Sequence, residues 1–410
     1  MKKLLVLTNV FPYSHSEQYM ETEEKYYTRF DKVWIAALGL TKTYAGSRRD
    51  LQSQAEVIPV RAQSGLFYYL SFLAVLGDRN LYKELFELKR THRLTKQRIW
   101  NLIGFLIRAH YDASLIDQAL KKEDKTDILI YAYRFERHAY IALLLRKKWG
   151  KQHPIVCRAH GYDLYEERSV IQYIPMRSVT LNEVDDVFPC SKCGVEYIKN
   201  RYPGRKARVD VRYLGTVDHR EKEFSFAGKG LSIVSCSNVL EVKRIDRIVD
   251  ALSMIEDIPI EWVHYGEGEL LDEIRAYAGD RLPQNVRASF PGNLPNTELL
   301  SEYASKDYYV LLNVSSSEGL PVSIMEAMSF GIPCIATDVG GTGEIVNESN
   351  GVLVSKEASP GEISDAIRFV YSMNDADYLA LRRRARASWK ERFDAEENYS
   401  AFIEELLTME

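Results

Sequence analysis

The chain has 410 residues, of which 46% are hydrophobic, 27% charged and 11% aromatic, and this composition is typical of a soluble globular protein with two or three domains. Its 54 Lys and Arg residues against 58 Asp and Glu residues give a net charge of −4, so no overall basic field exists and a nucleic-acid partner is not expected. The five cysteines are an odd number, which favours a reducing compartment over a disulfide scaffold. Cys190 and Cys193 form a single CxxC with no second pair beside it, so no metal site is expected.

The first apolar run of the chain predicts a buried strand. It follows two lysines, as in a secretory signal, but Thr8 and Asn9 break it after a few residues. The longest apolar run, Leu66–Leu76, is well short of the roughly 20 residues that cross a bilayer, so no transmembrane helix is expected.

Short apolar runs alternate with longer amphipathic stretches along the whole chain, and this alternation predicts parallel sheets covered by helices. The strands expected in the first half are Lys3–Leu7, Lys32–Ala37, Ile128–Ala132, Pro154–Arg158 and Asp186–Phe188. Those expected in the second half are Leu231–Cys236, Ile260–His264, Arg287–Phe290, Tyr308–Asn313, Pro333–Thr337 and Gly351–Val354. The polar stretch Thr216–Lys229 between them is the expected interdomain linker.

One segment departs from the average charge. Residues 78–110 carry eight Lys or Arg and three acids, a local charge of +5, with apolar residues interleaved. Together with the run Leu66–Leu76, this pattern predicts a surface that lies on an anionic membrane. The alternative interpretation is a pair of core-packed helices with a solvated basic face.

The segment from Ser315 to Gly343 carries the strongest functional signal. A predicted strand runs into a loop, and Pro321 stands where a helix would begin, a position at which its missing N–H costs nothing. The main-chain amides around it, at Gly319, Leu320 and Val322, would form a helix N-terminus, which is a ready site for phosphate.

Two carboxylates flank that helix start, Glu318 in the loop and Glu326 inside the helix, with seven residues between them. Carboxylates bind diols well, because each oxygen can accept from a neighbouring hydroxyl. A ligand with a sugar at one end, a diphosphate in the middle and a ribose at the other end would use both carboxylates and the amides.

Further candidate residues follow other strands of the second half. The turn that contains Gly266 and Gly268 allows close approach of a ligand, and ligands sit beyond the carboxyl ends of strands in open α/β sheets. Lys243 and Arg244 stand at the start of a predicted helix, where a cation opposes the helix dipole. A bound anion explains this pair better than helix stability does, and a merely solvated pair is the alternative.

These motifs resemble those of the retaining glycosyltransferases of family 4, and in particular bacterial transferases of exopolysaccharide, capsule or O-antigen assembly. The resemblance rests on TNVFPYSHSEQYMETE, CRAHGYDLYEER, RYLGT, VSCSNVLEVKR, WVHYGEGEL, FPGNLPNTEL, SEGLPVSIMEAM and TDVGGTGEIV. It implies an α/β fold of the GT-B type, with two facing Rossmann-like domains, parallel sheets and an interdomain cleft. Residues 1–220 would bind the acceptor, residues 221–391 the donor, and the helix over residues 392–410 would pack back on the first domain.

The resemblance also assigns roles in the donor site. Glu326 would bind the ribose of the donor and Glu318 the transferred sugar, while the main chain from Gly319 through Leu320 and Pro321 to Val322 would cradle the diphosphate. Lys243 would neutralise that diphosphate. The arginine that the family usually carries five residues earlier is Asn238 here, and Arg244 is expected to compensate for it.

In the first domain the resemblance points to the strand-end sequence from Arg158 to Asp163. His160 would lie near the donor sugar, with Asp163 as a further substrate-binding residue. The family's usual glycine pair in the first loop is replaced by Ser14-His15-Ser16-Glu17, and Glu17 is the expected acceptor contact.

The resemblance implies a retaining, metal-independent hexosyltransferase with no cofactor, in which the catalytic residues are His160, Lys243 and Glu318. The expected donor is a UDP-sugar and the expected acceptor a lipid-linked glycan or oligosaccharide, at the inner face of the cytoplasmic membrane. The alternatives are a nucleotide-sugar 2-epimerase of the same architecture and a non-catalytic nucleotide-sugar-binding protein.

Overall fold

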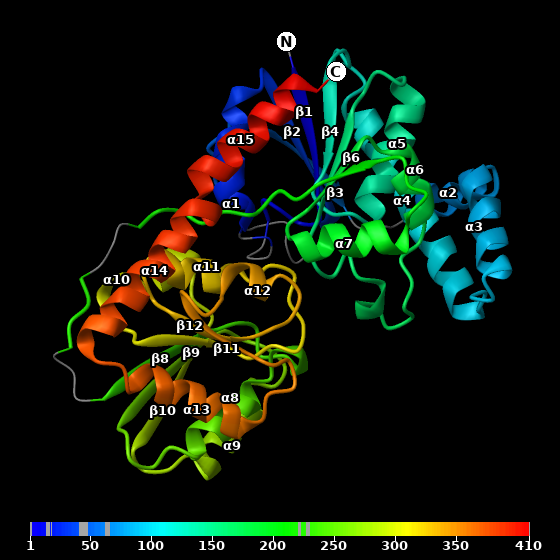
Figure 1. Cartoon of the computed structure of the whole chain (residues 1–410). Coiled ribbons are helices and arrows are strands. Elements are labelled where there is room, and N and C mark those ends of the chain that lie inside the picture. Colours follow the sequence, from blue (N-terminus) through cyan, green and yellow to red (C-terminus); the bar gives the residue numbers. More distant parts are fainter. Residues whose placement is uncertain are drawn as a thin grey trace. The chain divides into compact units, whose positions relative to one another are not determined.

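The structure is a computed structural model that describes residues 2–13, 17, 19–40, 48–61, 66–219, 223–226 and 230–409, with only the main chain at 66, 67 and 69 (Figure 1). The chain forms two compact units. The first unit comprises Met1–Arg212 and Tyr399–Glu410, and the second comprises Tyr213–Asn398. None of the helices in the described part of the chain has both the length and the hydropathy of a transmembrane span.

The first unit is built on a parallel sheet of seven strands in the order β3-β2-β1-β4-β5-β6-β7. Its strands are β1 (Lys3–Thr8), β2 (Lys32–Leu40), β3 (Glu56–Arg61), β4 (Ile128–Ala132), β5 (Ile155–Ala159), β6 (Asp186–Pro189) and β7 (Arg208–Val209). Its helices are α1 (Tyr19–Glu24), α2 (Leu66–Leu76), α3 (Arg79–Arg90), α4 (Lys96–Ala119), α5 (Arg137–Trp149), α6 (Arg177–Glu183) and α7 (Lys192–Arg201), with 3₁₀ turns at Lys25–Arg29 and Glu166–Arg168.

Helices cover both faces of this sheet, which is why its central strands are apolar throughout. On one face, alternate residues of β1 and β4, such as Leu5 and Ile130, pack with α4 and α5 in one apolar core. On the other face the ring of Phe402, from helix α15 (Ala395–Thr408), lies against the rings of Tyr131 and Phe188.

A buried ion pair lies beneath α15. Arg158 and Glu23 are both fully buried, with 3.5 Å between the guanidinium and the carboxylate. The Glu23 carboxylate also accepts hydrogen bonds from the hydroxyls of Tyr27 and Tyr131, and the Arg158 guanidinium stacks 4.7 Å from the centre of the Phe402 ring. The last helix therefore covers a charged group that would otherwise meet water.

The second unit is built on a parallel sheet of six strands in the order β10-β9-β8-β11-β12-β13. Its strands are β8 (Leu231–Cys236), β9 (Ile260–Tyr265), β10 (Val286–Gly292), β11 (Val310–Asn313), β12 (Cys334–Thr337) and β13 (Gly351–Val354). Its helices are α8 (Ile245–Ser253), α9 (Leu271–Arg281), α10 (Asn296–Ser305), α11 (Val322–Ser329), α12 (Thr342–Ile345), α13 (Pro360–Tyr371) and α14 (Asp375–Phe393), with a 3₁₀ turn at Glu241–Lys243.

The predicted α/β class with two Rossmann-like, parallel-sheet domains is confirmed, and each expected strand is present with ends that differ by a few residues. Residues 220–222 and 227–229 of the predicted linker lie outside the described residues. Before them, Thr216 packs with the second unit, because its hydroxyl accepts a hydrogen bond from the Trp389 indole at 2.7 Å.

Candidate functional site

The predicted donor residues lie at the carboxyl end of the second sheet. The strand order runs outward from β8 in one direction and from β11 in the other, so the crevice between these two strands is the place where an open α/β sheet binds its ligand. The segment after β8 carries Lys243 and the segment after β11 carries Glu318.

The structure brings Lys243 and Glu318 together. The Lys243 ammonium lies 2.7 Å from a Glu318 carboxylate oxygen, although the two residues are 75 positions apart in the sequence. The Glu318 side chain is buried and the Lys243 side chain about one-fifth exposed. Asn313, at the end of β11, places its amide nitrogen 3.5 Å from the same oxygen. The sequence predicted both ends of this pair but not the contact.

The start of α11 lies directly after Glu318. Pro321 is the N-cap and accepts hydrogen bonds from the main-chain amides of Ile324 and Met325. Among the described residues no acceptor receives the amides of Gly319, Leu320, Val322 or Ser323. A row of unengaged amides at a helix start, next to a lysine, is the arrangement that binds a phosphate group.

Close packing of loops fixes this main chain. Gly340 follows β12 with a φ of +55°, and a Cβ there would collide with the carbonyl oxygen of Glu318. The next amide, of Gly341, donates to the Gly319 carbonyl at 2.8 Å. The glycine-rich turn after β12 therefore holds the Glu318–Gly319 peptide in place.

The Gly266 and Gly268 turn has a similar role toward the loop after β8. A Cβ at either glycine would collide with the main chain of that loop, at Ser237 and Val239 respectively. These two glycines therefore set the path of the loop that carries Asn238, whose side chain is exposed.

Glu326 lies inside α11 and is more than nine-tenths buried. Its carboxylate accepts a hydrogen bond from the Asn296 side chain at 2.7 Å. Burial raises the pKa of Glu326 to about 7, and the Asn296 hydrogen bond opposes this rise only in part. Glu326 therefore changes its charge near neutral pH.

Arg244 has a φ of +50°, and its guanidinium donates to three main-chain carbonyls. The acceptors are Val314 at 2.7 Å, Lys356 at 2.9 Å and Ser315 at 3.0 Å. In this structure Arg244 thus ties the loop after β8 to the end of β11.

In the first unit the crevice of the sheet lies between β1 and β4, since the strand order diverges there. Glu17 is buried at this point, while Ser14, His15 and Ser16 lie outside the described residues. Its carboxylate accepts the main-chain amides of Asn9, Val10 and Phe11 at 3.0 to 3.3 Å, and lies 3.0 Å from Nε of Arg134. Burial pushes the pKa of Glu17 up, but Arg134 and the amides outweigh it and hold the pKa below its usual value.

His160 and Asp163 form one turn at the end of β5. The buried Asp163 carboxylate accepts the main-chain amides of His160 at 2.9 Å and of Phe135 at 2.8 Å, and so joins the ends of β5 and β4. Burial opposes its charge, but the neighbouring His160 and Arg134 and these hydrogen bonds hold the pKa of Asp163 well below its usual value. The His160 ring packs 5.5 Å from the Tyr19 ring and 5.1 Å from the Tyr133 ring, between centres.

Two residues of these sites were not predicted from the sequence: Arg134, which links Glu17 to the end of β4, and Asn296, which holds Glu326. Arg134 carried a usable signal, because it follows a predicted strand at nearly the same place as His160 follows the next one. Asn296 carried none, since it starts a helix far from Glu326 in the sequence.

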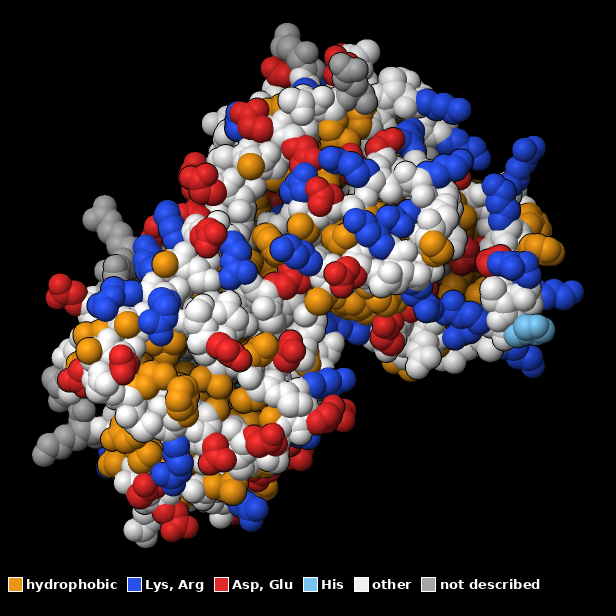
Figure 2. Space-filling view, viewed as in Figure 1, with side chains coloured by type: hydrophobic (Ala, Val, Ile, Leu, Met, Phe, Trp, Pro, Cys, Tyr) orange, Lys and Arg blue, Asp and Glu red, His pale blue; other side chains and the backbone are white. Residues whose placement is uncertain are grey.

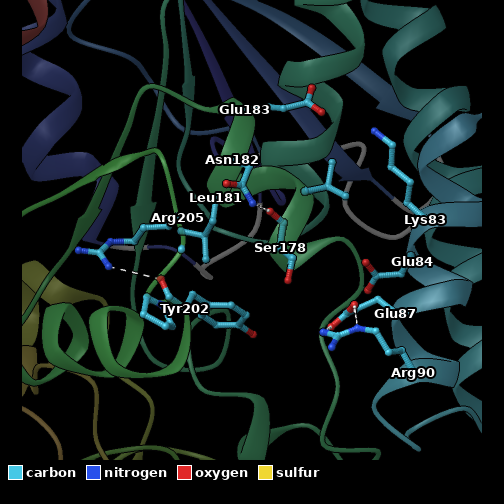
Figure 3. Close-up of a pocket in the computed structure, with 13 residues that line it drawn as sticks. Lys83, Glu84, Glu87, Arg90, Ser178, Leu181, Asn182, Glu183, Tyr202 and Arg205 are labelled. Atoms are coloured by element: carbon cyan, nitrogen blue, oxygen red, sulfur yellow. Dashed lines mark hydrogen bonds and ion pairs between the residues drawn. The ribbon is translucent and has the colours of Figure 1, made fainter.

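A separate cavity of about 620 Å³ lies in the first unit, where α3 faces α6 and the turn after α7 (Figure 3). Its charged lining mixes both signs: Lys83, Arg90 and Arg205 with Glu84, Glu87 and Glu183. None of the predicted site residues lines it. Within the described residues no group of three or more His, Cys, Asp or Glu is arranged to hold a metal ion, and Cys190 and Cys193 are not joined by a disulfide.

Comparison with known proteins places this geometry in a class. Residues 217–391 match the family model of glycosyl transferases group 1. The whole chain superposes on the crystal structure of Anabaena HepE in complex with UDP-glucose, with a TM-score of 0.70, 17% identity and 100% coverage of both chains. These findings support a GT-B glycosyltransferase with a group 1 domain.

Curated relatives give the same class. The N-acetyl-alpha-D-glucosaminyl L-malate synthase of Bacillus anthracis is 25% identical over 71% of this chain and 78% of its own length. The GtfA subunit of the UDP-N-acetylglucosamine–peptide N-acetylglucosaminyltransferase of Streptococcus agalactiae is 28% identical over 47% of this chain, which spans 39% of that subunit. The amylovoran biosynthesis glycosyltransferase AmsK of Erwinia amylovora is 24% identical over 42% of this chain and 44% of its own length. The chain therefore has homologues in polysaccharide biosynthesis.

Proposed function

We propose that this chain is a retaining glycosyltransferase that moves a hexose-type sugar from a UDP-sugar to a lipid-linked or oligosaccharide acceptor in cell-surface polysaccharide synthesis. The observation that carries the proposal is the Lys243–Glu318 pair beside the unengaged amides at the start of α11. The resemblance to family 4, the group 1 match and the UDP-glucose complex of HepE support it.

The donor diphosphate would lie on the amides of Gly319, Leu320, Val322 and Ser323, with the Lys243 ammonium beside it. Negative charge develops on the diphosphate as the glycosyl–phosphate bond breaks, so these donors stabilise the transition state more than the ground state. Lys243 would exchange Glu318 for the diphosphate. The exchange leaves a Glu318 oxygen available to accept hydroxyls of the transferred sugar.

Glu326 would accept the ribose hydroxyls at the other end of the donor. Its burial favours this role, because a diol hydrogen bond replaces the solvent that the carboxylate has lost. Asn296 would hold the carboxylate in place during binding.

In the first unit we propose that His160 contacts the transferred sugar and that Asp163 fixes the turn carrying it. The carboxylate of Glu17 is engaged by three amides and Arg134, so its part would be to shape the loop that meets the acceptor.

The reaction would follow a front-face path, as the resemblance implies. The bond from the anomeric carbon to the phosphate oxygen breaks, the acceptor oxygen bonds to the same face, and the acceptor proton passes to the departing phosphate. The path needs neither a protein nucleophile nor a metal ion. We place the enzyme in the cytoplasm, at the inner face of the membrane.

A panel of nucleotide sugars tests the proposal in two stages. Thermal shift identifies the donor, because a ligand that binds the native state raises the melting temperature. The donor is then incubated with and without glycan acceptors, and products are analysed by mass spectrometry and NMR. Transfer with retained anomeric configuration is expected. An epimer formed without acceptor, or donor binding with neither transfer nor hydrolysis, would instead support the epimerase or the non-catalytic binding protein.

A further inference from the structure

Three helices of the first unit, α2, α3 and α4, expose large apolar side chains. Trp100 is 73% exposed, Phe86 68% and Leu73 63%. We call the whole set the apolar patch, and it comprises Leu70, Phe72, Leu73, Leu76, Tyr82, Phe86, Leu94 and Trp100. Single exposed apolar residues are ordinary, but seven on three consecutive helices, with Leu94 in the loop between α3 and α4, mark an interaction surface. Figure 2 shows hydrophobic and basic side chains gathered over α2 and α3.

The helices that carry the patch are anchored to the core of the unit. Leu81 and Leu88 of α3 are buried in the apolar core, on the side opposite the exposed residues. Asp78 caps α3, and its carboxylate binds the His110 ring at 2.8 Å and the Tyr140 hydroxyl at 2.6 Å. The outward face of α3 is therefore held in a fixed orientation.

Four exposed cations accompany the patch: Arg79, Lys83, Lys89 and Lys96. None of these four outer cations forms an ion pair with another residue that the structure describes. Other cations of the segment are engaged, because Arg93 binds Glu166 at 2.7 Å and Arg98 donates to the Ile171 carbonyl at 3.0 Å.

The acids of the same helix do not offset this charge. Glu84 is buried, where it accepts the Tyr173 hydroxyl at 2.8 Å, and Glu87 is paired with Arg90 at 2.6 Å. On α3 the exposed rings of Tyr82 and Phe86 stand one turn apart, with Arg79 and Lys89 on the same exposed side, while the exposed Lys83 also lines the cavity between α3 and α6. The outward surface thus combines apolar tips with unpaired positive charge.

We infer that the apolar patch and the four outer cations dock the first unit on a membrane surface that contains anionic lipid. Apolar tips about one helical turn apart enter the boundary between headgroups and acyl chains, while lysine and arginine stay at the level of the headgroups. The apolar set spreads over three helices instead of lining a groove, and this favours a lipid surface over a single acidic peptide. The inference uses the first unit alone and does not depend on the donor.

Co-sedimentation of the full chain with vesicles tests this inference. Vesicles of phosphatidylcholine alone are compared with vesicles that also contain phosphatidylglycerol, at low and high salt. The wild type is expected to bind the anionic vesicles, and salt is expected to weaken binding because it screens exposed charges.

Two variants separate the contributions. Arg79→Glu/Lys83→Glu/Lys89→Glu is expected to lower the partition coefficient by roughly a hundredfold or more, since each cation near an anionic surface contributes about fivefold. Phe86→Ser/Trp100→Ser is expected to lower it by roughly tenfold or more through lost apolar insertion. Phe86→Leu/Trp100→Phe should retain most of the binding.

Matched controls keep the outcome specific to the patch. Lys121→Glu/Lys122→Glu/Lys199→Glu removes the same charge from exposed lysines of the first unit outside the patch, and Met254→Ser/Phe369→Ser removes exposed apolar groups from the second unit. Both should bind like the wild type. The inference would be overturned if the wild type showed no preference for anionic vesicles, or if the controls lost as much binding as the patch variants. The first of these outcomes would instead indicate that an acidic protein binds the patch.

The thermal shift with UDP-glucose is recorded on every variant. If the shift in melting temperature equals the wild-type value, the variant is folded, and its loss of vesicle binding comes from the membrane contact alone. A chain that binds vesicles but no nucleotide sugar would contradict the proposed function and leave the membrane inference standing.

Discussion

Both sheets have charged residues at corresponding crevices, but the two crevices differ in how many partners the chain itself supplies to those residues. In the first unit Glu17 at the β1–β4 crevice receives three amides and Arg134, so the chain satisfies its own charge. In the second unit the β8–β11 crevice holds one ion pair, and the described amides beside it remain unengaged. The difference shows two uses of a charged residue at a strand end. It stabilises the fold when the chain supplies all of its partners, and it is available to bind a ligand when the chain does not.

The sharpest test on the side of the first unit is Glu17→Ala. Removal of this carboxylate leaves Arg134 without its partner in a mostly buried position, so the free energy of unfolding should fall by about 3 to 5 kcal/mol. Urea denaturation measures this change in the free energy of unfolding. Because the folded pKa of Glu17 is lowered, its stabilisation is present above the unfolded pKa near 4.5 and is lost as the pH falls, so the variant should lose less stability in acid than the wild type. Equal acid sensitivity of both proteins would contradict the assigned pair.

The corresponding test in the second unit is Lys243→Ala. Turnover should fall by about a hundredfold to a thousandfold, since a donor to the developing diphosphate charge contributes about 2.7 to 4 kcal/mol. The free energy of unfolding should also fall, by about 1 to 3 kcal/mol, because the buried Glu318 carboxylate loses its cationic partner. Steady-state kinetics with the identified donor measures the effect, and Lys356→Ala, at an exposed lysine of the same unit, is the control. Wild-type turnover in Lys243→Ala would show that Lys243 does not act in the donor site.

Glu326→Gln separates folding from function at one position. The folded pKa of about 7 against an unfolded value near 4.5 means that burial of Glu326 destabilises the native state increasingly as the pH rises from about 4.5 to 7. The variant should match the wild type near pH 4.5 and exceed its stability by about 3 kcal/mol at pH 8, while donor affinity falls. Denaturation across this range measures the first effect and calorimetric titration the second. A constant stability difference at all pH values would contradict the raised pKa.

The smallest expected effect comes from Asn238→Arg. An added cation on the exposed loop after β8 should strengthen donor binding by about 1 kcal/mol, roughly fivefold. Calorimetric titration of UDP-glucose at two salt concentrations measures it, with Asn238→Gln as the neutral control. An unchanged affinity would indicate that the position lies too far from the diphosphate.

The sequence predicted most of the fold because buried parallel strands are continuous apolar runs between polar turns. Strand β3 was not predicted, because Pro59 interrupts its apolar run. A proline is tolerated there because β3 lies at the edge of the sheet. Strand β7 has only two residues and leaves no pattern to detect.

The candidate site was predicted in part for a related reason. Lys243 and Glu318 were found because each follows a strand, and the ends of adjacent parallel strands converge. The tether of Arg244 to three carbonyls and the hydrogen bond from Asn296 to Glu326 were not predictable, since both depend on loops whose paths are set by contacts distant in the sequence.

The packing of Phe402 over Arg158 has a consequence for the order of assembly during translation. The ribosome completes residues 399–409 only after it has made the entire second unit, so the nascent first unit waits with the Arg158 guanidinium uncovered. The first unit is therefore completed by residues that are synthesised after the whole of the second unit.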